Sequence, residues 1–233
     1  MKTKAKSSTS GILGPRKESV QVKLLGAVRN SILAGELHPG DPVPELHLAR
    51  AHGVSQTTVR EALVKLEHAG LVRRIHNMGT FVTQMSPREI QERLRLRVML
   101  EGLAAMEAAR LALPQNLAEM DRRLKAISQA IAANDYFEAA QADLEFHRCI
   151  WRCSANNTLY QILDQITVPL FAFVSMERRR LRENLTDAVQ AHEPIANALK
   201  ARNASAAQDA IRVHIETSYA EFLGSAQSYS LSV

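Results

Sequence analysis

The segment "SQTTVREALVKLEHAG" (residues 55–70) has the pattern of a short amphipathic helix. Four of its apolar residues follow the i, i+3, i+4, i+7 spacing of one buried helix face: Val59, Ala62, Leu63 and Leu66. Ser55 belongs to a residue type that caps helix N-termini, and Gly70 to a type that ends helices. The segment therefore predicts a helix that buries one face and presents a polar face with Arg60 and Lys65.

Two further helices are predicted before this segment. Apolar residues at helical spacing predict a first helix from Ser19 to the glycine at 35. The stretch "ELHLARAHG" (residues 45–53) predicts a short second helix that ends at its glycine. Between them, the prolines and the glycine of "LHPGDPVP" (residues 37–44) predict a turn.

A small hairpin is predicted after the segment. The runs "LVRRI" (residues 71–75) and "TFVTQ" (residues 80–84) have strand composition, and "HNMG" between them has the polar, glycine-containing pattern of a hairpin tip. Residues 18–85 are therefore expected to form three helices and a small β-hairpin.

A short helix, a tight turn and a second amphipathic helix make a helix-turn-helix, whose second helix enters the major groove of DNA. In that arrangement Gln56 can pair with adenine and Arg60 with guanine, while hydroxyls and the helix N-terminus suit phosphates. The candidate DNA-contacting residues of the helix and the hairpin are Ser55, Gln56, Thr57, Thr58, Arg60, Lys65, Arg73, His76 and Gly79. An ordinary three-helix packing unit with solvated polar faces explains the periodicity equally well.

The remainder of the chain has helical patterns and no strand pattern. Six helices are predicted: one before Pro114, one before Asn134, and four at about 136–154, 158–176, 186–202 and 205–223. An antiparallel all-α bundle is the economical architecture for such a series. The chain as a whole is therefore expected to be mainly α, with five parts: an arm at 1–17, a DNA-binding domain at 18–85, a linker at 86–92, a helical sensing domain at 93–226 and a tail at 227–233.

Charge is distributed unevenly along this chain of 233 residues, which has a net charge of +5. Residues 1–85 hold 12 Lys and Arg against 6 Asp and Glu, whereas residues 86–233 hold 17 against 18. Five of the N-terminal cations lie in the arm, so the folded part of that half carries only a small excess. The charge therefore supports a polyanionic partner such as DNA only weakly.

Composition indicates a soluble globular protein, with 46% apolar residues and a mean hydropathy of -0.16. No uninterrupted apolar run approaches the roughly 18 residues needed to cross a bilayer, and the basic N-terminus lacks the apolar core of a signal peptide. Cys149 and Cys153 lie four residues apart in one predicted helix, which fits neither a disulfide framework nor a Cys-x-x-Cys metal pair. A cytoplasmic location without membrane contact is expected.

The stretch "DLEFH" places Asp143 and His147 one helical turn apart, where a carboxylate and an imidazole can chelate one divalent ion. Only two other histidines follow residue 86, His192 and His214, and each lies in a different predicted helix among apolar residues. Three imidazoles and a carboxylate suit Zn, Ni or another first-row divalent ion. A surface ion pair or a buried core histidine explains the "DLEFH" pair alone.

The stretch "LARAHGVSQTTVREALVKLEHAGLVRRIHNMGTFV" (residues 48–82) resembles the winged helix-turn-helix of GntR-family bacterial transcription regulators, notably in GVS-x-T-x-VREAL and in AGLV followed by a wing glycine. Together with the helical second half, the chain resembles the FadR subfamily, which carries an FCD-type sensor domain. The resemblance covers about residues 18–225.

Three positions depart from the family pattern. The family usually has Arg where this chain has Gln56, Pro where it has Thr58, and often an Arg near Leu46. Two cations that touch DNA in relatives are therefore missing. We expect a different operator sequence or a greater contribution from the basic arm, with Arg60 as the main cation at the bases.

The resemblance also implies a metal site and a ligand. Metal-containing FCD regulators have Asp and His on one helix and a His on each of two later helices, which corresponds to Asp143, His147, His192 and His214. The resemblance implies that the metal binds the carboxylate of a small organic acid. Arg97 and Glu101 are candidates for contacting that effector, although an exposed intrahelical salt bridge explains their spacing equally well.

Two neighbouring features have more ordinary explanations. Cys149, Trp151 and Cys153 directly follow His147, and core packing is the simpler interpretation of this cluster. The run "ERRRLRE" (residues 177–183) resembles a solvated loop or helix end, although its arginines are also placed to border the entrance for an acidic ligand.

The expected function is a ligand-responsive regulator, not an enzyme. A homodimer would bind a pseudo-palindromic operator on double-stranded DNA, the effector would shift the two DNA-binding domains, and repression is the family default. A metal-dependent enzyme is a second hypothesis, because three histidines and a carboxylate also describe catalytic metal sites. A third hypothesis is an acyl-CoA sensor, which would not need the metal ligands.

Overall fold

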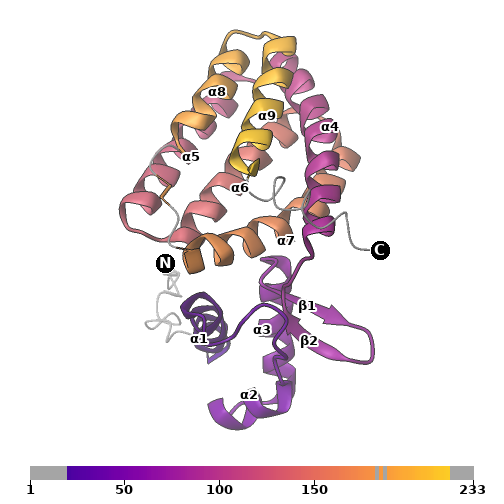
Figure 1. Cartoon of the computed structure of the whole chain (residues 1–233), viewed down its shortest axis with the longest axis vertical. Helices are drawn as coiled ribbons and strands as arrows, with labels where there is room; N and C mark the ends of the chain where they lie inside the picture. The colour runs from indigo at the N-terminus through magenta and orange to yellow at the C-terminus, as the bar shows by residue number, and fades with distance from the viewer. Residues whose placement is uncertain (1–19, 182–183, 186–187, 221–233) are drawn as a thin grey trace, which may run out of the picture.

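The computed structural model describes residues 20–181, 184–185 and 188–220, and these form a helical protein with one small sheet (Figure 1). The elements are α1 (Val20–Ala34), α2 (Glu45–His52), α3 (Gln56–His68), β1 (Val72–Ile75), β2 (Gly79–Val82), α4 (Pro87–Leu111), α5 (Pro114–Ala132), α6 (Tyr136–Cys153), α7 (Asn157–Leu181), a 3-10 turn η1 (Gln190–His192), α8 (Glu193–Lys200) and α9 (Ala204–Ser218). The fold class expected from the sequence is confirmed. The predicted arm at 1–17 and tail at 227–233 lie outside the described residues.

The N-terminal unit contains the three predicted helices and the hairpin. Ser55 caps α3, since its hydroxyl accepts a hydrogen bond from the backbone N–H of Thr58 at 3.1 Å. Gly53 closes α2 and Gly70 follows α3, both with left-handed backbone (φ of +62° and +73°) that glycine adopts without strain. The four apolar residues of α3 that the pattern singled out are all buried.

The hairpin has an antiparallel register from Val72 opposite Val82 to Ile75 opposite Gly79. Its turn uses positive φ at Asn77 and Gly79. The turn before α2 adds contacts that the sequence did not reveal: the backbone N–H of Val43 donates to the carbonyl of Thr80 at 2.8 Å, on the other edge of β2. The wing is therefore anchored to the segment that leads into α2.

Helix α4 begins directly after the hairpin, at Pro87. Its N-cap is Ser86, whose hydroxyl accepts from the backbone N–H of Glu89, and proline suits the first helical position. The segment 86–92 that we expected as a linker is therefore mainly the first turns of α4, because "SPRE" is itself a helix start signal. Figure 1 shows α4 leaving the hairpin and running along the edge of the helical bundle.

Helix α7 is longer than the predicted 158–176 and contains Pro169 in its interior. Proline has no N–H to donate to the carbonyl four residues earlier, which weakens a helix locally. By length and composition α7 is apolar enough to cross a membrane, although it has no uninterrupted apolar run of that length. Since 61% of its most apolar window is buried inside the protein, α7 is a core helix of the bundle.

The last two predicted helices differ from the structure at their starts and ends. The helix expected at 186–202 is replaced by η1 and α8, because Pro194 lacks the N–H that a continuous helix would need and suits the first turn of a new one. Residues 186–187 lie outside the described part of the chain. The helix expected at 205–223 is α9, capped by Asn203, and residues 221–223 are likewise outside the description.

The two halves of the chain meet at α7, which lies across the end of the bundle facing α1 and α3 (Figure 1). Gly70, at the end of the α3 turn, sits so close that a Cβ there would be 2.7 Å from the carbonyl oxygen of Val168 and 2.9 Å from Cα of Pro169. From the bundle side, Arg93 of α4 donates to the carbonyl of Ile166 at 2.9 Å. The N-terminal unit therefore rests on the backbone of α7 at its proline.

Candidate metal centre and nucleic-acid interface

The four predicted metal ligands come together inside the bundle. Helix α6 carries Asp143 and His147, η1 carries His192, and α9 carries His214. One ligand atom from each lies within 4.8 Å of the others. The three histidines are buried, and the Asp143 side chain is 19% exposed. The structure thus brings together residues that are up to 71 positions apart in the sequence.

Two of the imidazoles are held by acceptors on their outer sides. His147 donates from Nδ1 to Oε2 of Glu101 at 2.6 Å, and His192 donates from Nδ1 to the carbonyl of Ala188 at 2.7 Å. Their Nε2 atoms consequently face the centre of the cluster, 3.3 Å and 2.9 Å from Oδ1 of Asp143. His214 Nε2 lies 3.3 Å from His147 Nε2. This is the orientation in which Nε2 lone pairs converge on one point.

The electrostatics of the cluster call for a cation at that point. With Nδ1 of His192 already donating, a neutral ring directs an Nε2 lone pair at the Asp143 carboxylate, so two acceptors face each other at 2.9 Å. Burial raises the pKa of Asp143, but the attraction to His192 and His147 and the hydrogen bonds with both rings together outweigh burial and hold the pKa well below its usual value. A divalent ion or a proton between these atoms resolves the conflict.

The pKa values of His147 and His214 are shifted in opposite directions. Burial lowers the pKa of His147, but the charge of Glu101 and the hydrogen bonds to Asp143 and Glu101 outweigh burial and raise the pKa to about 9. Burial, with repulsion from His192 and His147, holds the pKa of His214 well below its usual value, so His214 is neutral. The donor set of one carboxylate and three imidazoles, with ligand atoms within 4.8 Å of one another, fits a first-row divalent metal.

Arg97 and Glu101 are completely buried on α4, so the exposed salt bridge that the sequence allowed is wrong. Arg97 Nε donates to Oε1 of Glu101 at 2.6 Å, and Oε2 of Glu101 accepts from His147 and from Trp151 Nε1 at 3.2 Å. Burial raises the pKa of Glu101, but the charges of Arg97 and His147 and the hydrogen bonds from both side chains together outweigh burial and lower the pKa to about 2. Glu101 is therefore the ionised group that orients a candidate metal ligand.

The guanidinium of Arg97 lies over two aromatic rings. Its Cζ is 4.8 Å from the ring centre of Phe171 and 5.2 Å from that of Tyr219. Its Nη1 and Nη2 atoms are buried, and neither pairs with a carboxylate of the described residues. A buried guanidinium of this kind beside a cluster of metal-type ligands suits an additional acceptor such as a carboxylate.

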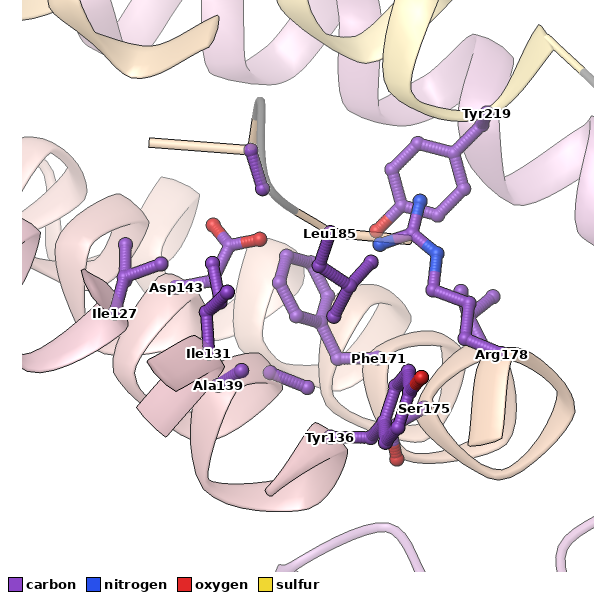
Figure 2. A pocket seen from close by; sticks show the side chains of 13 residues that line it. Ile127, Ile131, Tyr136, Ala139, Asp143, Phe171, Ser175, Arg178, Leu185 and Tyr219 are labelled. Atoms are coloured by element: carbon purple, nitrogen blue, oxygen red, sulfur yellow. The ribbon is translucent and has the colours of Figure 1, made fainter. Parts of the chain in front are cut away.

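A cavity of about 30 Å³ adjoins the cluster, and Asp143 forms part of its wall (Figure 2). Figure 2 shows Asp143 on one side, Arg178 and Tyr219 on the other, and Phe171 between them. Polar groups also come from Tyr136 and Ser175, and apolar groups line the remainder. A space of this size holds about two water molecules, so a larger ligand requires the surrounding side chains to move.

Sequence reasoning identified only part of this cavity. The arginine-rich run at the end of α7 was noted, and its Arg178 donates to the carbonyl of Ser218 at 2.6 Å beside the cavity. Tyr136, Ser175 and Tyr219 were missed. A usable signal existed on α7, because Phe171, Ser175 and Arg178 follow the i, i+4, i+7 spacing of one helix face.

The cysteine cluster belongs to the core. Cys149, Trp151 and Cys153 are buried, and burial raises the pKa of Cys153 to about 11, so its thiol stays protonated at neutral pH. Glu145 on the same helix is paired with Arg148 and Arg152, away from the metal ligands.

The candidate DNA-contacting residues of α3 lie on an exposed face. Gln56, Thr57 and Arg60 are exposed, Thr58 is half-buried, and the Ser55 hydroxyl is engaged in the cap and lies 3.0 Å from the hydroxyl of Thr58. Gln56 and Arg60 are four residues apart and share one side of the helix. These two side chains are therefore the outward-facing pair at the start of α3.

Lys65 is on a different side of α3. Its Nζ is 3.4 Å from Oε1 of Gln21 on α1, and it lies roughly 140° around the helix from Arg60. In the hairpin, Arg73, His76 and Gly79 are exposed. The structure thus groups the residues at the α3 N-terminus, leaves the wing residues accessible, and turns Lys65 toward α1.

Comparison with protein families gives two matches that divide the chain as the structure does. Residues 21–82 match the model of bacterial regulatory proteins of the gntR family, and residues 92–217 match the FCD domain. The first covers α1 to the hairpin, and the second covers nearly all of the bundle, including the four clustered ligands.

Named relatives are regulators. A "Probable D-xylose utilization operon transcriptional repressor" from Paenarthrobacter nicotinovorans is 30% identical over 79% of this chain and 80% of its own length. The HTH-type transcriptional regulator LutR from Bacillus subtilis (strain 168) is 27% identical over 78% of this chain and 91% of its own length.

Solved structures share the fold. E. coli McbR/YncC superposes with a TM-score of 0.69 at 22% identity, over 92% of this chain and all of that chain. A putative transcriptional regulator GntR from Rhodococcus sp. RHA1 gives a TM-score of 0.66 at 24% identity, over 88% of this chain and 97% of that chain. With its winged helix-turn-helix and its helical sensor domain, the chain belongs to the GntR family of bacterial regulatory proteins and is a DNA-binding transcription regulator with an FCD domain, not an enzyme.

Proposed function

We propose that this regulator binds operator DNA as a homodimer and responds to a small organic acid held beside a divalent metal in its FCD domain. The observation that carries the proposal is the buried cluster of three histidines and Asp143. The cluster adjoins a cavity and contacts α7, on which the DNA-binding unit also rests.

The ligands of the metal are assigned to Asp143, His147, His192 and His214. Carboxylate and imidazole donors favour Zn, with Ni or another first-row ion as alternatives. Such an ion supplies Lewis-acid positions that a carboxylate oxygen can take. Glu101 and the carbonyl of Ala188 support the assignment, because partners that fix the second ring nitrogen are typical of metal-binding histidines.

The effector is assigned to the class of small carboxylic acids. The buried Nη atoms of Arg97 pair with no described carboxylate, and Arg178 brings a second positive charge to the cavity wall. Glu101 acts on the effector indirectly, by holding Arg97 and His147 in place. An organic acid requires this cavity to widen, and an acyl-CoA effector would require a much larger rearrangement.

Coupling between the two halves is assigned to α7. Phe171 packs edge-on against His147 with ring centres 5.9 Å apart, and Arg178 borders the cavity. One turn before Phe171, the backbone at Val168 and Pro169 contacts Gly70. A ligand shifts a regulatory equilibrium only if it binds the two states with different affinity, and a displacement of α7 supplies such a difference.

DNA recognition is assigned to α3 and the wing. Gln56 and Arg60 face outward from the start of α3 and suit adenine and guanine respectively, while Arg73, His76 and Gly79 are exposed for backbone or minor-groove contacts. A homodimer on a pseudo-palindromic operator is the usual arrangement for this motif, and the name of the Paenarthrobacter relative supports repression. Such a regulator acts in the cytoplasm.

The test combines metal analysis with DNA binding. Purified protein is expected to contain about one divalent ion per chain, and His147→Ala and His214→Ala are expected to lose it. His68→Ala is the matched control, since His68 is exposed at the end of α3. Selection of duplexes from a random pool then reports sequence-selective binding at moderate salt.

Two results would count against the proposal. Full metal content in both histidine variants rejects the metal assignment, and absence of any enriched duplex rejects the DNA-reading assignment. A screen of small carboxylic acids against the selected duplex identifies the effector class, as the acid that changes DNA affinity in the metal-loaded protein.

A further inference from the structure

Arg60, the outward-facing cation of α3, has one partner in the described structure. Its Nε donates to Oε2 of Glu45 at 2.7 Å. Glu45 is the first residue of α2, so the contact joins the first helix of the helix-turn-helix to the second. The Arg60 side chain is 60% exposed, whereas that of Glu45 is 24% exposed. The arginine is therefore tethered at its inner edge and open at its outer edge.

The tether leaves the two terminal nitrogens of Arg60 available. Arg60 makes no other hydrogen bond or ion pair with the described residues. A guanidinium is a planar fork, and fixing Nε fixes the direction of the Nη1–Nη2 edge. That edge is one that can donate two parallel hydrogen bonds to O6 and N7 of guanine. Ordering it before DNA arrives lowers the entropy lost on binding.

Glu45 also changes what Arg60 offers to a phosphate. A carboxylate 2.7 Å from the guanidinium cancels most of its charge at distances beyond the pair, so the attraction to the DNA backbone is reduced. The hydrogen bonds from the Nη groups to a base remain, because they depend on geometry as well as charge. The pair thus favours base contact over backbone contact.

Two other cations of the same unit lack this arrangement. Lys65 is near the neutral amide of Gln21, and Arg73 on β1 has no ion pair with any described residue. Gln56, on the same side of α3 as Arg60, is exposed and neutral. The only carboxylate that contacts Arg60 within the described chain is Glu45.

We infer that Glu45 is a positioning residue for DNA recognition: it aims the Arg60 fork at a guanine and suppresses phosphate binding by the same side chain. The inference rests on the proposed role of α3 as the DNA-reading helix. It predicts opposite effects of removing the carboxylate on specific and non-specific binding.

The experiment uses the full-length protein and two probes, a duplex enriched by the wild type from a random pool and a scrambled duplex of equal length. Dissociation constants are measured for both at several salt concentrations. The variants are Glu45→Gln, Arg60→Ala, the double variant and, as a control on the same unit, Arg73→Ala. Helical content and metal content verify that each variant is folded.

Glu45→Gln is expected to lower the ratio of specific to scrambled affinity about fivefold or more, near the lower end of what an arginine–guanine pair contributes. When the selection is repeated with Glu45→Gln, the loss of sequence preference should be confined to one guanine position. A merely structural role of Glu45 would not produce such a local loss. Binding to the scrambled duplex should tighten, and its salt dependence should steepen by about one phosphate contact. In the Arg60→Ala background, Glu45→Gln should leave the ratio unchanged. Arg73→Ala should weaken both duplexes similarly.

Three outcomes overturn the inference. An unchanged ratio in Glu45→Gln means that the pair is only a surface salt bridge. Equal tightening on both duplexes means that Glu45 is a general electrostatic brake and does not aim the arginine. An unchanged ratio in Arg60→Ala means that Arg60 reads no base, even though the chain selects DNA; failure to enrich any duplex is the separate result that rejects the proposed function.

Discussion

The candidate metal cluster and the candidate DNA-reading face of α3 differ in how their side chains are held. In the cluster, Glu101 alone accepts hydrogen bonds from three side chains, and the groups around it are enclosed by the bundle. On the face of α3, Gln56 and Thr57 are exposed, and Arg60 has one tether. The comparison shows that the side chains of the cluster are ordered before a ligand arrives. The side chains on the face of α3 would become ordered mainly on binding DNA.

The difference has an energetic consequence. Removing one member of a buried charged network leaves an uncompensated charge, whereas removing an exposed pair changes little. Substitutions in the cluster should therefore affect folding and ligand binding together. Substitutions on the exposed face of α3 should change DNA binding with little change in stability. The following four predictions test this contrast, beginning with the largest effect.

Glu101→Gln should have the largest effect. It leaves Arg97 buried without a counter-charge, so the free energy of unfolding should fall by about 3–5 kcal/mol. Loss of the partner of His147 should also weaken metal binding by about 10- to 100-fold. Denaturant unfolding and a chelator competition measure the two effects. Glu119→Gln is the matched control, because Glu119 pairs with Arg122 and Arg123 at the surface and should cost only about 0–1 kcal/mol.

Metal affinity should depend strongly on pH. In the metal-free protein His147 has its pKa raised to about 9, so a metal must displace its proton at neutral pH. Apparent affinity should therefore fall about tenfold for each unit of pH decrease near neutrality, with proton release detectable by buffer-dependent calorimetry. A pH-independent affinity would contradict the assignment of His147 as a ligand.

In the metal-free protein, the stability that His147 contributes changes with pH in the opposite direction to metal affinity. A raised pKa means that the folded state binds the proton more tightly than the unfolded state. The stability that His147 contributes is present below its ordinary pKa of 6.5 and is lost as the pH rises through about 9. Thermal unfolding of chelator-treated protein across this range should show the decline, and His147→Ala should abolish it.

Gly70→Ala should have an intermediate effect. The new Cβ would meet the backbone of Val168 and Pro169 at 2.7 Å and 2.9 Å, which no side-chain movement relieves. Gly53→Ala is a matched control, since Gly53 has similar positive φ and open space around the added Cβ. Both variants should lose about 1 kcal/mol to backbone strain, and Gly70→Ala about 1–3 kcal/mol more through the collision.

The same pair of variants tests coupling through α7. The ratio of DNA affinities with and without metal should shrink in Gly70→Ala and persist in Gly53→Ala. An equal ratio in both variants would mean that the contact at Gly70 does not transmit the effect of the metal to DNA binding.

Ser55→Ala and Ser86→Ala should have the smallest effects on stability. Each removes a hydroxyl that caps a helix, with a cost of about 0.5–2 kcal/mol. Ser55→Ala should also weaken DNA binding, because it loosens the end of α3 that faces the groove. Ser86 caps α4, so Ser86→Ala should leave DNA affinity within about twofold at matched folded fraction. Equal losses of DNA affinity would mean that stability alone explains both.

Much of the fold followed from local patterns. The cap at Ser55 and the buried face of α3 depend on neighbouring residues, so the sequence predicts them directly. The break at Pro194 was missed because the apolar spacing continues across it. The extension of α7 to Leu181 was missed because the charged run at 177–183 was interpreted as a solvated loop or helix end.

The candidate site was predictable only in part. His147 and His214 are 67 residues apart, and no local pattern brings them together; the resemblance to FCD regulators did. The role of Glu101 could not be inferred, because its i, i+4 spacing with Arg97 is identical for an exposed and a buried pair. Tyr219 reaches the cavity from the end of α9, a placement that depends on how the whole bundle closes.

The groups that orient His147 and His192 differ in how easily a mutation removes them. His147 is oriented by the side chain of Glu101, which a single codon change removes. His192 is oriented by the main-chain carbonyl of residue 188, which every amino acid possesses. A scan of alanine variants would therefore detect one support and miss the other. At position 188 selection acts on the path of the backbone through the turn, so the residue there can drift while the support for His192 persists.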